Sequence, residues 1–92
     1  MRQVSRFLAC VNQRVSGSSS DNEILAGLGR AIRTRRLEMD MSQEALANLS
    51  GVDRSHMGKI ERGERNVTLL NIERVAKVLD RLPSQLLIDA GF

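Results

Sequence analysis

The feature that most constrains the fold is a pair of short amphipathic segments separated by a turn that contains a glycine. The first segment, residues 43–49, follows Ser42, a residue type that caps the free N–H groups of a helix's first turn. Gly51 comes next and can take the left-handed conformation that ends a helix. The second segment, residues 54–62, follows Asp53, another preferred capping residue. The sequence therefore predicts two short helices joined by a tight turn.

The outer face predicted for residues 54–62 is cationic and rich in hydrogen-bond donors. Met57 and Ile60 fall on the core side when residues are placed about 100° apart, the angle of a helix. The opposite arc holds small or polar residues without an acid: Arg54, Ser55, Gly58, Lys59 and Arg62. A helical glycine costs about 1 kcal/mol relative to alanine, but at Gly58 it allows a partner to approach closely. Because the DNA major groove admits a helix, this pair predicts a DNA-binding helix-turn-helix. The alternative is a solvated face that tolerates its glycine.

The rest of the chain shows helical periodicity and no alternating strand pattern. Residues 23–40 carry one apolar face, and a second apolar stripe follows Thr68, a capping residue type. Residues 84–92 end the sequence with a short apolar helix. We therefore predict an all-α domain of five helices over residues 23–92. The residues of the two apolar faces are Leu25, Leu28, Ala31 and Ile32, then Ile72, Val75, Ala76 and Leu79.

The first 22 residues are predicted to stand apart from this domain. An amphipathic stripe at helical spacing predicts an additional N-terminal helix, and the Ser/Gly-rich stretch 16–22 indicates a linker. This segment has three possible roles: it stabilises the domain, contacts DNA through Arg2 and Arg6, or binds a protein partner. The stripe consists of Val4, Phe7, Leu8, Val11 and Val15.

Composition excludes several classes of protein. Among the 92 residues is a single cysteine, Cys10, which rules out an internal disulfide and fits a reducing cytosol. No stretch approaches the roughly 18 apolar residues of a membrane span, and the N-terminus lacks a signal-peptide core. A lone Cys10 and a lone His56 provide neither a nucleophile–base pair nor a set of metal ligands. We therefore expect a cytoplasmic protein that is not an enzyme and has no cofactor, metal site, membrane partner or small-molecule ligand.

The sequence resembles the Xre/Cro family of lambda-repressor-like DNA-binding domains over residues 25–91. The resemblance lies in "SQEALA", the turn glycine, "IERGERN" and the following "TLLNIERVAKVL". It is strongest to the small controller proteins of restriction–modification systems. The resemblance implies a lambda-repressor-like five-helix fold. It also implies a transcriptional regulator that binds double-stranded DNA as a homodimer on a roughly palindromic operator.

The resemblance also implies roles for individual residues, to which the helix geometry above adds Gly58. Base contacts are expected from Arg54, Ser55, Gly58 and Lys59. Contacts with the DNA backbone are expected from Ser42, Gln43, His56, Arg62, Arg65 and Asn66. Arg36 and Glu61 match an internal ion pair of the family. The dimer interface is expected at Leu82, Leu86, Leu87 and Ile88, which are very apolar for the end of a monomer. Pro83 departs from the family pattern, which has a Ser or Thr cap there.

The sequence is compatible with two other functions. The first is an antitoxin or adaptor whose N-terminal segment binds a protein partner. The second is RNA binding, which the composition disfavours: single-stranded RNA is usually held by stacking aromatic side chains, and the chain has only Phe7 and Phe92.

Overall fold

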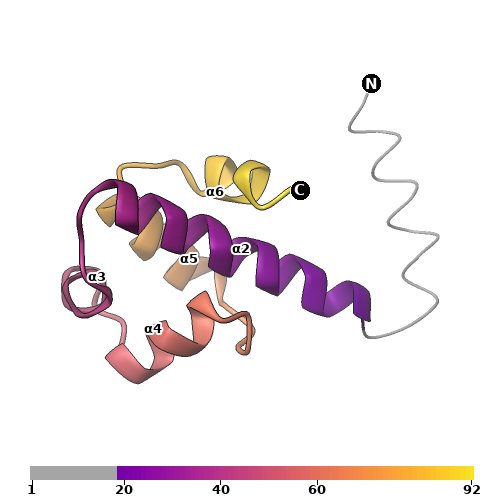
Figure 1. The fold of residues 1–92 in the computed structure, drawn as a ribbon, viewed down its shortest axis with the longest axis horizontal. Coiled ribbons are helices and arrows are strands. Elements are labelled where there is room, and N and C mark those ends of the chain that lie inside the picture. The colour runs from indigo at the N-terminus through magenta and orange to yellow at the C-terminus, as the bar shows by residue number, and fades with distance from the viewer. Residues whose placement is uncertain (1–18) are drawn as a thin grey trace.

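The computed structural model describes the backbone of residues 19–92 and the side chains from Glu23 onward (Figure 1). This part of the chain forms five helices and no strand, which confirms the predicted all-α fold. The predicted N-terminal helix, with Cys10 and the two arginines considered for DNA contact, lies outside the described residues. The helices are α2 (Ser19–Glu38), α3 (Gln43–Ser50), α4 (Arg54–Glu61), α5 (Leu69–Val78) and α6 (Pro83–Asp89). None of these helices is long and apolar enough to cross a membrane.

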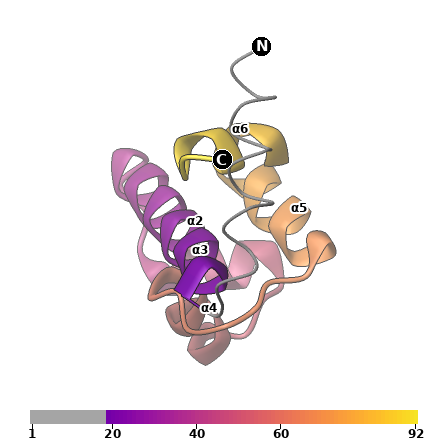
Figure 2. The same cartoon turned by 90° about the vertical axis from the view of Figure 1, so that its right-hand side faces the viewer.

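The long helix α2 runs through the middle of the domain and separates α4 from α6 (Figure 1). It packs on both of them, while α3 packs on α4 and α5, and α5 on α6. The turned view places α4 and α6 at opposite ends of the molecule (Figure 2). The aliphatic core fills the space between the helices and consists of Leu28, Ala31, Ile32, Leu46, Ala47, Val52, Met57, Ile60, Ile72, Val75, Ala76, Leu79 and Leu86.

The predicted caps and the turn glycine are present. The Ser42 hydroxyl accepts a hydrogen bond from the Ala45 N–H at 3.0 Å, and the Thr68 hydroxyl accepts one from the Asn71 N–H at 3.1 Å. Gly51 has φ 77°, the left-handed conformation that ends α3. As a result α3 and α4 each end within one residue of the predicted position.

The start of α2 corrects the predicted linker boundary. The helix begins at Ser19 rather than at Glu23, so the linker does not extend through residue 22. Serine is common in linkers but is also favoured at helix starts, so a serine-rich stretch is compatible with either structure. At its other end α2 stops at Glu38, since Asp40 takes a positive φ of 54°.

A close contact between α2 and the end of α4 depends on Gly29. A Cβ atom at this position would lie 2.5 Å from the backbone oxygen of Glu61 and 2.6 Å from that of Ile60. Only a residue without a side chain permits this separation of the two helices. Gly29 thereby sets the position of α4 relative to the rest of the domain.

The last helix begins at Pro83, in the first helical position, where proline's missing N–H and fixed φ are no disadvantage. No Ser or Thr side chain caps this helix; the Leu82 N–H at its start donates to the Gln85 side-chain oxygen at 2.9 Å. The dimer-interface prediction requires one correction here: Leu86 is 0% exposed and belongs to the core of the monomer. Leu82 and Ile88 are 62% and 63% exposed, and Leu87 is half-buried against the core.

Candidate nucleic-acid interface

Helix α4 is anchored on one side and open on the other. Met57 and Ile60 are buried in the core, whereas Arg54 and Ser55 at the helix start are exposed. The open side forms a hollow that we call the α4 hollow, lined by Gln43, Asp53, Arg54, Ser55, Gly58, Lys59 and Arg62. The structure thus gathers all four predicted base-contacting residues around one concave surface, together with Gln43 and Arg62.

Gly58 is not the exposed centre of this surface that the sequence predicted. It is buried, because the side chains of Gln43 and Arg62 lie over it. A Cβ atom at position 58 would lie 3.2 Å from Arg62 Nη1 and 3.4 Å from Gln43 Oε1. The glycine therefore makes room for two polar side chains at the floor of the α4 hollow.

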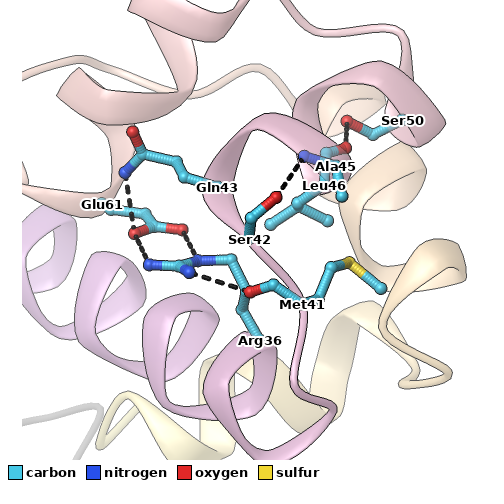
Figure 3. A network of polar contacts seen from close by, with 8 residues as sticks. All are labelled: Arg36, Met41, Ser42, Gln43, Ala45, Leu46, Ser50 and Glu61. Atoms are coloured by element: carbon cyan, nitrogen blue, oxygen red, sulfur yellow. Dashed lines mark hydrogen bonds and ion pairs between the residues drawn. The ribbon is translucent and has the colours of Figure 1, made fainter.

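A buried ion pair holds this floor in place (Figure 3). Arg36 Nε donates to Glu61 Oε2 at 2.8 Å, and Arg36 Nη2 donates to Glu61 Oε1 at 2.9 Å. Arg36 Nη1 donates to the Met41 carbonyl at 3.0 Å, and Gln43 Nε2 donates to Glu61 Oε1 at 3.1 Å. The predicted Arg36–Glu61 pair is therefore present, and it connects α2, the α2–α3 loop, α3 and α4. It also orients the Gln43 amide at the floor of the α4 hollow.

Asp53 adds an acid to the start of this otherwise cationic surface. Its Oδ2 accepts hydrogen bonds from the Ser55 N–H, at 3.2 Å, and from the Ser55 hydroxyl. The pKa of Asp53 is lowered, first by the Ser55 side-chain hydrogen bond and then by backbone hydrogen bonds from His56 and Ser55. The carboxylate is therefore ionised at neutral pH.

A second hollow, the α4–α5 hollow, lies on the other side of the start of α4. It is lined by Gly51, Val52, Asp53, Ser55, His56, Arg65, Asn71 and Arg74. Two predicted backbone-contacting residues, His56 and Arg65, thus line one hollow with Asn71 and Arg74 of α5, for which the sequence predicted no role. Asn71 and Arg74 are three residues apart on α5, and Arg74 Nη1 donates to Asn71 Oδ1 at 3.4 Å. Their place beside α4 follows from the packing of α5 and has no local signal in the sequence.

The remaining predicted backbone-contacting residues are Arg62 and Asn66, which follow α4, and Ser42, which precedes α3. Arg62 forms an exposed ion pair with Glu64, with 3.1 Å between Nε and Oε2, and this hydrogen bond lowers the pKa of Glu64. Asn66 is exposed and lines neither hollow, and Ser42 is exposed at the start of α3. Within the described residues, no group of three or more His, Cys, Asp or Glu side chains could hold a metal ion.

Comparison with known proteins identifies the family. A helix-turn-helix family model matches residues 32–87. The chain is 41% identical over 64 residues to control protein C.SmaI of Serratia marcescens, covering 70% of this chain and 76% of that protein. It is 43% identical over 67 residues to control protein C.BamHI of Bacillus amyloliquefaciens, covering 72% of this chain and 83% of that protein.

A solved structure agrees with these matches. The restriction–modification controller protein C.AhdI from Aeromonas hydrophila superposes with a TM-score of 0.66 at 48% identity. The alignment covers 67% of this chain and 94% of that one. The chain therefore belongs to the helix-turn-helix family, in the Xre/Cro group that its sequence resembles.

Proposed function

We propose that the chain is a sequence-specific transcriptional regulator that binds double-stranded DNA as a homodimer on a roughly palindromic operator. The observation that carries this proposal is the pair of hollows on the two sides of the α4 N-terminus. In this motif the N-terminal residues of the recognition helix meet base edges in the major groove. The two hollows supply one surface for bases and one for the flanking phosphates.

The α4 hollow suits base edges. The side chains of Arg54 and Lys59 can donate hydrogen bonds but cannot accept them. The planar guanidinium of Arg54 matches the two acceptors of guanine, O6 and N7. Gln43, which is bonded to Glu61 at the floor of this hollow, has a second amide hydrogen that can donate to a phosphate.

The α4–α5 hollow suits phosphates. Arg65 and Arg74 are exposed and line this hollow, and neither lines the α4 hollow. Contacts of this kind set the position of a protein on DNA and supply most of its salt-dependent affinity. We therefore assign Arg65, Arg74 and His56 to the DNA backbone.

Two exposed apolar side chains support the homodimer. Leu82 precedes the first residue of the short helix α6 and Ile88 lies within the helix; they are 62% and 63% exposed. A twofold interface would cover the same patch on both subunits. This assignment keeps three of the four predicted interface residues and leaves out Leu86, which the core already buries.

The relatives suggest which genes are regulated. C.AhdI is described as a restriction–modification controller protein, and it is 48% identical to this chain over the aligned region. We extend that role to this chain: regulation of a restriction–modification system, carried out in the cytoplasm.

Selection of bound duplexes from a random pool tests the proposal. The full chain should enrich two inverted half-sites whose centres lie about 10 base pairs, or a multiple of that, apart. Enrichment of no sequence would contradict a sequence-specific function. Enrichment of one isolated half-site, bound by a monomer, would contradict the homodimer.

A further inference from the structure

Asp53 fixes the hydrogen-bonding role of Ser55. A serine hydroxyl has one hydrogen to donate and two lone pairs that can accept. In the structure that hydrogen goes to Asp53 Oδ2, which also accepts the Ser55 N–H at 3.2 Å. The hydroxyl group is therefore left with acceptor capacity only.

The Ser55 hydroxyl continues to donate to the ionised Asp53 carboxylate when a base is nearby. The pKa of Asp53 lies below its usual value because Ser55 and the backbone N–H groups of Ser55 and His56 donate to it. A hydrogen bond to an ionised acceptor is roughly twice as strong as one between neutral groups. A neutral base oxygen or ring nitrogen is thus a weaker acceptor for the Ser55 hydrogen than Asp53 is.

Ser55 is exposed and lines the α4 hollow beside Arg54 and Lys59. In the major groove, adenine N6 and cytosine N4 present donors, while guanine O6 and N7 and thymine O4 present acceptors. An acceptor-only hydroxyl therefore complements an amino group and is mismatched to the other edges.

We propose that Asp53 is a positioning residue that presents Ser55 as a hydrogen-bond acceptor, so that Ser55 selects an amino-bearing base, adenine or cytosine. This inference rests on the proposed function, since it concerns how the α4 hollow reads DNA. The two adjacent residues would then recognise different bases: Arg54 donates to guanine, and Ser55 accepts a hydrogen bond from the amino group of adenine or cytosine.

Two substitutions of Asp53 distinguish the effect of its hydrogen-bond acceptor from the effect of its negative charge. Asp53→Asn and Asp53→Gly remove the same negative charge, and both residues are accepted at a helix N-cap, but only asparagine keeps an acceptor for the Ser55 hydroxyl. Both variants should bind all DNA more tightly. Asp53→Gly and Ser55→Ala should lose the preference at one symmetric position, from about tenfold to less than about twofold. Asp53→Asn should keep a larger part of it, because its amide oxygen can still accept from Ser55, although less strongly than the carboxylate. Thermal unfolding of each variant checks that the fold is kept.

The unaltered protein provides a second measurement. On the selected operator, the adenine or cytosine that depends on Ser55 is replaced by purine or 2-pyrimidinone, which lack the amino group. We expect an affinity loss of about tenfold from this deletion alone.

Several results would overturn the inference. Asp53→Gly could keep the full preference, or the position that depends on Ser55 could select guanine or thymine. Ser55→Ala could keep a preference that Asp53→Gly loses, which would make Asp53 itself the reader. In each of these cases the wild-type chain still selects an operator. If it enriches no sequence at all, the proposed function has failed and this inference fails with it.

Discussion

Arg36 and Glu61 face each other from α2 and the last turn of α4, joined by two hydrogen bonds of 2.8 and 2.9 Å. Their side chains are 10% and 3% exposed. We expect Glu61→Ala to lower the free energy of unfolding by about 3–5 kcal/mol, because it leaves the Arg36 guanidinium buried without its partner. Urea denaturation at a fixed protein concentration measures this loss.

The Arg35–Glu38 pair provides the matched control. It joins residues three apart on α2, with 3.4 Å between its atoms, and the Glu38 side chain is 54% exposed. Glu38→Ala should therefore cost at most about 1 kcal/mol. Similar losses for Glu61→Ala and Glu38→Ala would contradict the structural role given to Arg36 and Glu61.

Alanine at position 29 should destabilise the domain even though alanine is the better helix former. The new Cβ would lie 2.5 Å from the Glu61 backbone oxygen, which cannot move without displacing α4. We expect a net loss of about 1–3 kcal/mol. Gly58→Ala is the control, since its nearest neighbour is the flexible end of Arg62 at 3.2 Å. That variant should be neutral or gain up to about 1 kcal/mol in helix propensity. Equal effects at the two positions would show that packing at Gly29 is looser than the structure indicates.

Leucine at position 58 should separate folding from DNA binding. Its side chain must displace Gln43 and Arg62 and would raise the floor of the α4 hollow. We expect specific binding to be lost while the domain stays folded, because the helix propensity gained with leucine offsets the loss of the Gln43–Glu61 hydrogen bond. Fluorescence anisotropy on the selected operator, together with thermal unfolding, measures both. Unchanged affinity would mean that this part of the hollow does not approach DNA.

The local features of this fold could be predicted from the sequence because their signals lie within a few residues. Ser42, Gly51, Asp53 and Thr68 are each next to the helix end that they define, and the structure places caps or a turn at all four. The boundary of α2 could not be predicted in this way, since serine suits both a linker and a helix start.

The errors concern contacts between distant parts of the chain. In the seven-residue helix α6, periodicity alone does not decide which leucine faces the core, and the structure buries Leu86, which the sequence assigns to the dimer interface. The burial of Gly58 depends on Gln43, fifteen positions earlier, and Arg74 reaches the α4–α5 hollow only through the packing of α5. Such tertiary relationships leave no local pattern in the sequence.

An acidic substitution at Ile88 should produce monomers. Ile88 is 63% exposed, so aspartate costs little in the folded monomer but places a charge in the proposed interface. Sedimentation equilibrium should show loss of the dimer, and operator affinity should fall with it. Leu69→Asp is the control, because Leu69 is 80% exposed on α5, outside the proposed patch. If Ile88→Asp remains dimeric while Leu69→Asp does not, the interface lies on α5.

Arg54 and Arg74 should contribute to DNA binding in different ways. Arg54 lies at the N-terminal end of α4 in the α4 hollow, where its fork can donate to O6 and N7 of one guanine. Arg54→Ala should cost about 1–3 kcal/mol on the selected operator and relax the preference at one symmetric base-pair position. Arg74→Ala should weaken binding to the operator and to random DNA by similar factors, since phosphate contacts carry no direct sequence information. Because a dimer loses two such contacts, the slope of log affinity against log salt should become shallower by about 1.8. Competition binding at several salt concentrations measures both effects. If Arg54→Ala instead keeps the parental ratio of operator to random DNA binding, α4 is not the helix that reads the sequence.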